Sequence, residues 1–168
     1  MQTSGTLQRE LKQKRAFVSV QQEATVAILR TADLARRLMN LALESSDITG
    51  QQFNVLRILR GAGPEGLPTL EIAERMIEQT PGITRLIDRL EEKKLVLRRR
   101  PSEDRRCVYC SISPGGLKLL DTLDQPVVEM GKAALASLSS KEVAQLVELL
   151  GRTRESMNQQ LIERRRTS

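Results

Sequence analysis

The segment spanning residues 49–112 changes its apolar periodicity once, from helical spacing of three and four residues to strict alternation. Its helical part contains three short stretches, and the last of them starts at Thr80-Pro81. Threonine as an N-cap followed by proline in the first turn is a typical helix start. The alternating residues 106–112 predict a β-strand that pairs with residues 95–100 as a hairpin. Three helices followed by a hairpin predict a winged helix-turn-helix.

The three expected helices each carry an apolar face for a shared core. The first begins at Thr49, because Thr49 and Gln52 have the spacing of a capping box. The second covers about residues 68–77, with an inward face formed by Leu70, Ala73 and Ile77. The third is expected to bury Ile83, Leu86, Ile87 and Leu90. Its polar residues then face outward: Thr84, Arg85, Asp88, Arg89 and Lys93.

Long amphipathic helices are expected on both sides of this segment. One covers residues 20–43 and would be about 36 Å long, which exceeds what one face of a small globule needs. Another begins at Ser113-Pro114, with a kink or restart expected at Pro126. A capping box, Ser139-x-x-Glu142, opens a last helix that ends near residue 157 or 161. The basic tail Arg164-Arg165-Arg166 is expected to be disordered.

These elements predict a mainly α fold with a small β-hairpin wing, dimeric through its N- and C-terminal helices. We expect three regions along the chain. Residues 1–47 form an N-terminal arm and dimerisation helix, and residues 48–113 form the winged helix-turn-helix. Residues 114–168 form C-terminal dimerisation helices and the basic tail.

Charge and composition limit the chemistry of the chain. The formal net charge is +6 and no histidine is present, which excludes His-based acid–base catalysis and His metal ligands. Positive charge is concentrated at 85–106, where nine Lys/Arg stand against five Asp/Glu. We identify no nucleophile–base pair, phosphate-binding glycine loop or metal cluster, so we expect no enzyme, no cofactor and no metal. Without a signal peptide or a long apolar run, we expect a cytoplasmic location and no membrane partner.

Four strings in this segment stand out: TGQQFNVLRIL at 49–59, EIA at 71–73, ITRLIDRLE at 83–91 and the wing sequence Asp104-Arg105-Arg106. In their order and spacing they resemble the MarR family of winged helix-turn-helix transcriptional regulators. After the wing, VYCSIS at 108–113 is followed by Gly116, which is the usual pattern in family members. The sequence departs from the family in two places. Ile77 stands where the turn often carries glycine, and Cys110 stands where a branched aliphatic residue is usual.

The resemblance implies a homodimeric, sequence-specific regulator of transcription, a repressor that binds a pseudo-palindromic operator in double-stranded DNA. It leaves open whether a small-molecule effector releases the DNA. At the wing tip, Arg106 would enter the minor groove next to Arg105, oriented by a hydrogen bond to Asp104. The residues that would open the recognition helix toward the major groove are Thr80, Pro81, Gly82, Thr84 and Arg85.

Two further basic residues, Arg89 and Arg99, belong to the predicted DNA-binding set, although each also has a purely structural interpretation. Arg89 can contact a phosphate or form an intramolecular ion pair, because it lies farther along the recognition helix. Arg99 lies in the run Arg98-Arg99-Arg100, which can contact phosphates or form a solvated strand edge. Asp88 would be repelled by phosphate, so we expect it to pair with an arginine of the wing or of the helix.

Two alternative functions remain open at this point. A winged helix can serve as a protein-interaction module that does not bind DNA. Cys107 and Cys110 also suggest a thiol-based redox sensor. On a strand, however, residues three apart point to opposite faces and lie about 10 Å apart, whereas a disulfide needs Cα atoms within about 7 Å. Zinc would need two further ligands, which the chain lacks.

Overall fold

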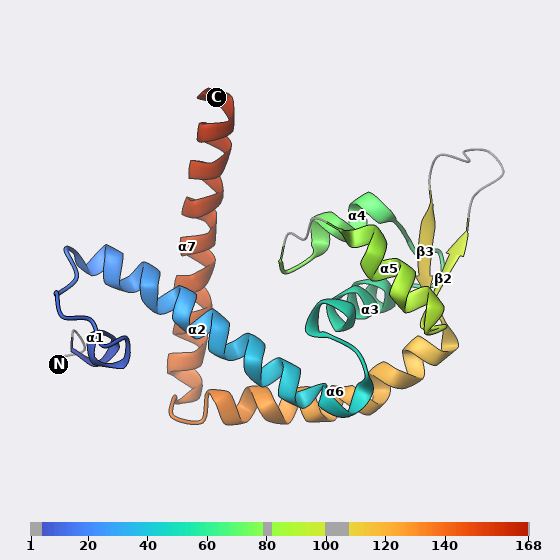
Figure 1. Cartoon of the computed structure of the whole chain (residues 1–168), viewed down its shortest axis with the longest axis horizontal. Coiled ribbons are helices and arrows are strands. Elements are labelled where there is room, and N and C mark those ends of the chain that lie inside the picture. Colours follow the sequence, from blue (N-terminus) through green and yellow to red (C-terminus); the bar gives the residue numbers. More distant parts are fainter. Residues whose placement is uncertain (1–4, 79–81, 100–107, 168) are drawn as a thin grey trace. The chain divides into compact units, whose positions relative to one another are not determined.

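The computed structural model describes residues 5–78, 82–99 and 108–167, and the structural statements below concern these residues (Figure 1). The chain divides into two compact units, Met1–Met130 and Gly131–Ser168, each described on its own. The first unit begins with α1 (Thr6–Glu10), α2 (Val20–Ala42) and the short 3-10 helix η1 (Glu44–Ser46). The elements that follow are α3 (Gly50–Ala62), β1 (Leu67–Pro68), α4 (Thr69–Arg75), α5 (Ile83–Glu92), β2 (Val96–Arg99), β3 (Tyr109–Ile112), α6 (Pro114–Ala134) and α7 (Ser140–Thr167).

A compact head is formed by α3, α4, α5 and the small sheet (Figure 1). Its core is aliphatic, as a chain with 2% aromatic residues requires. Each buried Leu or Ile contributes about 1.5–3 kcal/mol relative to exposure, so these residues hold the helices in place. The fully buried side chains of the head are Val55, Leu56, Leu59, Ile72, Ile87, Leu90, Val96 and Cys110.

The start of α3 confirms the predicted capping box. The Thr49 side chain accepts a hydrogen bond from the Gln52 backbone N–H, and the Gln52 side chain accepts one from the Thr49 N–H. Both donors lack partners within the helix, so this exchange fixes the first turn.

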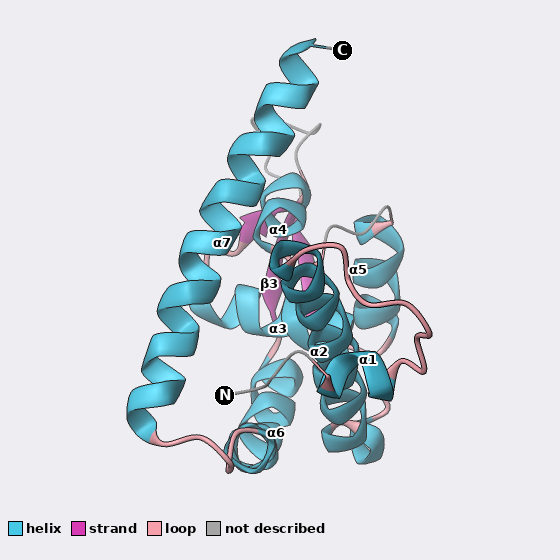
Figure 2. Cartoon of the chain, turned by 90° about the vertical axis from the view of Figure 1, so that its left-hand side faces the viewer, coloured by secondary structure: helices cyan, strands magenta, loops and turns pink. Residues whose placement is uncertain are grey.

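The sheet has three strands in the order β1-β3-β2, all antiparallel, and Figure 2 shows it in magenta among the helices. The hairpin β2–β3 confirms the sequence prediction, whereas β1 was not predicted because it has only two residues. Gly66 makes β1 possible: its φ is +70°, and a Cβ there would lie 2.1 Å from the carbonyl oxygen of Cys110. Only glycine allows that approach.

The predicted inward face of α4 is wrong. Leu70 and Ile77 are 78% and 84% exposed, while Ile72 and Met76 are buried. Ile72 and the C-cap residue Met76 are spaced by four residues, so in the sequence this alternative stripe is as regular as the one predicted. The contacts of α4 with α3 and α5 determine which of the two stripes is buried. The periodicity within one short helix does not determine it.

Two expectations about the C-terminal helices also need correction. The helix α6 continues through Pro126 and does not restart there. The basic residues Arg164–Arg166 lie in the last turn of α7, which runs to Thr167, so they are not a disordered tail. The hydrogen bonds between Ser139 and Glu142 confirm the capping box that opens α7. No described helix combines the length and the apolar character needed to cross a membrane.

The junction between α5 and β2 contains a strained residue, Lys94, with φ of +59°. Its N–H donates to the carbonyl of Glu91, which helps to end the helix. This left-handed conformation usually belongs to glycine, because a Cβ costs about 1 kcal/mol there.

We therefore expect Lys94→Gly to raise the free energy of unfolding by about 0.5–1 kcal/mol. Urea unfolding of both proteins measures this difference. Lys94→Ala is the matched control, because it removes the charge but keeps the Cβ, and it should give no gain. An equal gain in both variants would assign the effect to charge and not to backbone strain.

Candidate nucleic-acid interface

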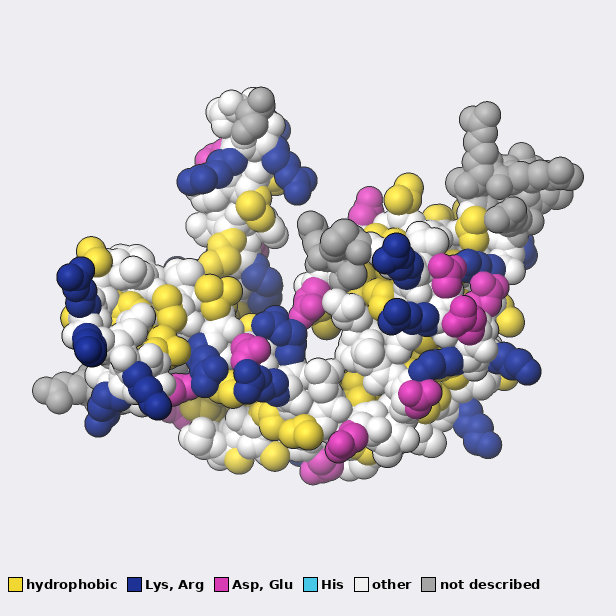
Figure 3. Space-filling view, in the orientation of Figure 1, with side chains coloured by type: hydrophobic (Ala, Val, Ile, Leu, Met, Phe, Trp, Pro, Cys, Tyr) yellow, Lys and Arg dark blue, Asp and Glu magenta, His cyan; other side chains and the backbone are white. Residues whose placement is uncertain are grey.

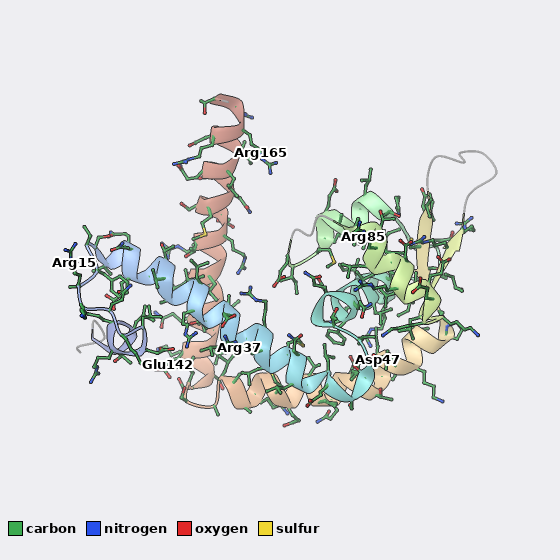
Figure 4. All side chains as sticks on the ribbon, viewed as in Figure 1. Arg15, Arg37, Asp47, Arg85, Glu142 and Arg165 are labelled. Atoms are coloured by element: carbon green, nitrogen blue, oxygen red, sulfur yellow. The ribbon has the colours of Figure 1, made fainter. Side chains whose placement is uncertain are left out.

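The helix α5 presents one apolar and one polar face, as its sequence predicts. Leu86, Ile87 and Leu90 are buried against the head, which fixes the rotation of the helix about its axis. On the other side, Thr84, Arg85 and Arg89 are exposed (Figure 4 labels Arg85). The three lie within two turns, so their side chains share one surface.

Arg85 and Arg89 differ from most basic residues of the head because their guanidinium groups form no ion pair with any residue that the structure describes. The alternative interpretation of Arg89 as an intramolecular partner therefore receives no support within these residues. Basic side chains with no acidic partner can offer all their donors to an external anion.

The segment that leads into α5 is anchored from α3. The N–H of Ile77 donates to Asn54 Oδ1 at 2.9 Å, so this turn forms with isoleucine at the position where glycine was expected. The glycine conformation appears instead at Gly82, which precedes α5 with φ of +127°. The described helix begins at Ile83, and the predicted start at Thr80-Pro81 lies outside the described residues.

Several predicted contact residues lie outside the described residues. Gly82, Thr84, Arg85, Arg89 and Arg99 are described, and the first four belong to α5 or its N-cap. The residues outside the described part are Thr80, Pro81, Asp104, Arg105, Arg106 and also Cys107.

Two other basic residues have intramolecular partners. The Lys93 ammonium contacts the carboxylate of Asp47 at 2.9 Å and also its backbone carbonyl. Arg99 lies 3.6 Å from Glu65, and its guanidinium is 5.8 Å from the centre of the Tyr109 ring. Both Arg99 and Glu65 are well exposed, so this ion pair is weak and leaves Arg99 able to meet another anion.

Two acidic residues on α5 pair with an arginine of the strand β2. Arg98 on β2 lies 2.6 Å from Asp88 and 3.4 Å from Glu91, which confirms the prediction that Asp88 pairs with an arginine. Sequence reasoning missed the role of Arg98 and grouped it with Arg99 and Arg100. Strand alternation could have found it, because Arg98 shares a face with the buried Val96 and Arg99 does not.

A second missed contact joins the head to α6. Arg60 donates to both carboxylate oxygens of Asp124, at 2.8 and 3.0 Å. The hydrogen bonds lower the pKa of Asp124 below its ordinary value. The pair therefore stabilises the fold at neutral pH, and its contribution is lost as acid protonates Asp124.

Cys110 is enclosed in the head and has 0% exposure. Burial raises the pKa of its thiol, and a contact with Thr69 Oγ1 at 3.8 Å and the charge of Arg98 offset this only in part. The reactive thiolate is therefore disfavoured. Among the described residues, no group of three or more acidic or cysteine side chains could hold a metal ion.

Figure 3 shows basic and acidic side chains intermingled on the face of the head that it draws. Asp88, Glu91 and Asp47 each have a cation beside them, whereas Arg85 and Arg89 are exposed and form no ion pair among the described residues.

Comparisons with known proteins agree with this arrangement. The model of the MarR family matches residues 48–108. The homoprotocatechuate degradative operon repressor of Escherichia coli is 27% identical over 126 residues, which cover 75% of this chain and 84% of that protein.

Two solved structures extend the comparison. A MarR transcription factor from Planctomyces limnophilus is 40% identical with a TM-score of 0.63, covering 80% of this chain and 98% of its own. A mutant MarR from E. coli in complex with operator DNA is 28% identical with a TM-score of 0.70, covering 77% and 91%. Identity and coverage at these levels show that the chain belongs to the MarR family.

Proposed function

We propose that this chain is a sequence-specific regulator of transcription, a repressor that binds a pseudo-palindromic operator in double-stranded DNA as a homodimer. The observation that carries the proposal is the outer face of α5, where Thr84, Arg85 and Arg89 are exposed and the two arginines have no acidic partner within residues 5–78, 82–99 and 108–167. An α-helix fits the major groove of B-form DNA, and arginine there can donate two hydrogen bonds to a guanine.

The remaining predicted contacts complete this interface. Thr80, Pro81 and Gly82 would bring the start of the recognition helix to the base edges. At the wing, Asp104 would orient Arg106, with Arg105 beside it, toward the minor groove and its negative potential. Arg99 would position the wing by a phosphate contact, which carries no sequence information.

The dimer is supported by apolar side chains that the single chain leaves exposed. On α2, Leu29 and Leu41 are both 65% exposed, and on α7, Val147 and Leu161 are 62% and 57% exposed. Side chains of this kind are stabilised when a second copy covers them. A dimer with twofold symmetry presents two heads, which matches the inverted repeat of a palindromic operator.

The proposal also covers how the chain is regulated and where it is located. One relative, the homoprotocatechuate degradative operon repressor of E. coli, is named as a repressor, and derepression of an operon requires release from DNA. A small molecule would release this chain only if it bound the DNA-free conformation more tightly. A regulator of transcription must reach the DNA that it controls, and we propose a cytoplasmic location on that ground.

The proposal is tested by measuring the affinity of the full chain for duplex DNA at several salt concentrations. Arginine and lysine contacts with phosphates release counterions, so the logarithm of the association constant should fall linearly with the logarithm of salt concentration. The expected slope is about −0.9 for each phosphate neutralised. If no duplex is retained even at low salt, the chain would instead be a protein-interaction module.

A further inference from the structure

We infer that Arg98 is a positioning residue that ties the wing strand β2 to the recognition helix α5, so that the two DNA-contacting elements move as one rigid body. The consequence for DNA binding rests on the proposed function. The tie itself is a property of the free protein.

Three contacts carry the inference. The Arg98 guanidinium lies 2.6 Å from Asp88, 3.4 Å from Glu91 and 3.4 Å from the backbone carbonyl oxygen of Thr84. These positions are spaced by four and three residues, so they form a stripe along one side of α5. One planar side chain thus contacts two turns of the helix, including the turn that bears Arg85.

The other end of Arg98 is fixed by the sheet. Its strand pairs with β3, where Arg98 stands opposite the buried Cys110, and its neighbour on the same face is the buried Val96. The Arg98 side chain is 24% exposed, whereas that of Arg99 is 62% exposed on the opposite face. The pairing of β2 with β3, beside the buried Val96 and Cys110, therefore fixes the point at which the Arg98 side chain leaves the sheet.

The ion pairs of Arg98 also change the charge that α5 would present to DNA. Asp88 and Glu91 lie on a helix that would approach a polyanion, and unpaired carboxylates there would repel phosphates. Arg98 pairs with both carboxylates and offsets one of their two negative charges. Burial by itself would lower the pKa of Arg98, but the hydrogen bond to Asp88 and the charges of Glu91 and Asp88 raise it, so the group stays charged.

This arrangement distinguishes Arg98 from a phosphate contact. A residue that touches phosphate contributes to specific and non-specific binding alike and adds to the salt dependence. A residue that orients the recognition helix contributes mainly to the specific complex, since only that complex requires base edges to be met in register.

The first test uses hydrogen exchange of the free protein and needs no DNA. Arg98→Met keeps an unbranched apolar stem and removes the charge and the hydrogen-bond donors. We expect backbone amides of α5 to exchange several times faster in this variant, because the helix loses its link to β2. Arg99→Met is the matched control on the same strand and should leave the exchange of α5 unchanged. Equal exchange of α5 in both variants would refute the tie.

The second test measures affinity for the preferred duplex and for an unrelated duplex. Arg98→Met should reduce the ratio of these affinities about tenfold, with little change in the salt slope of non-specific binding. A salt slope that is smaller in magnitude by about 0.9, with an unchanged ratio of the two affinities, would show that Arg98 contacts a phosphate instead. Arg98→Lys keeps the charge but reaches fewer of the three partners, so it should give an intermediate ratio; it also serves if Arg98→Met does not fold.

A charge exchange completes the design. Asp88→Arg combined with Arg98→Asp restores the ion pair with reversed polarity, and we expect slower α5 exchange than in either single variant. No such rescue would contradict the pairing. If the unchanged protein binds no duplex at all, the proposed function fails, while the exchange measurements still decide whether Arg98 holds the helix.

Discussion

Arg85→Ala is expected to weaken binding to the preferred duplex about ten- to a hundredfold, with a much smaller effect on an unrelated duplex. Arg85 lies in the first turn of α5, is exposed and has no acidic partner among the described residues. A bidentate arginine contact with a guanine contributes about 1–3 kcal/mol of discrimination, which corresponds to this change in affinity. Titration of both duplexes at one salt concentration measures it.

Arg152→Ala on α7 is a suitable control for Arg85→Ala. Arg152 is 72% exposed and lies outside the predicted DNA-binding region, so the substitution removes the same charge without removing a base contact. Its effect should be small and equal for both duplexes. If the two variants lose the same affinity, Arg85 acts only through the net charge of the protein and does not read bases.

Gly116→Ala is expected to lower the free energy of unfolding by about 2–3 kcal/mol. Gly116 is buried in the first turn of α6, where a Cβ would lie 2.4 Å from the carbonyl oxygen of Leu95 and 2.8 Å from Ile112 Cγ1. Leu95 also accepts a hydrogen bond from the Ser113 N–H, so its carbonyl cannot move away freely. The overlap of the added Cβ with Leu95 and Ile112 can be relieved only if α6 moves away from the β2–β3 hairpin.

Gly61→Ala provides the comparison for this prediction. Gly61 is exposed near the end of α3, and no atom would lie within 4 Å of an added Cβ. Alanine there should raise stability by about 0.5–1 kcal/mol, since glycine is unfavourable within helices. Denaturant unfolding of both variants gives the two values. A loss in Gly116→Ala no larger than the change in Gly61→Ala would mean that the first turn of α6 adjusts easily.

Local signals in the sequence predicted the elements well wherever the deciding contacts lie within a few residues. The capping boxes at Thr49 and Ser139 depend on groups three residues apart, and both form. The inward face of α5 is equally clear, because its apolar and basic residues separate cleanly around the helix. The strand β1 and the inward face of α4 depend on distant partners, Cys110 and the helices α3 and α5, and were missed or wrong.

The candidate site was predicted in its residue types but not in its internal contacts. The sequence places Thr84, Arg85 and Arg89 outward, as observed. Strand alternation separates Arg98 from Arg99, but it does not show that the face bearing Arg98 meets Asp88, because that depends on how a strand ten residues away packs against the helix. The division at residues 47–48 and 113–114 and the roles of the wing-tip residues stay predictions.

The central claim is that two identical heads read the two halves of one duplex site. Selection of the sequences that the full chain retains from a random duplex pool tests it most directly. The account predicts an inverted repeat whose half-sites are centred about one helical turn, roughly 34 Å, apart. Recovery of a single unrepeated motif, or of no preferred sequence, would contradict it.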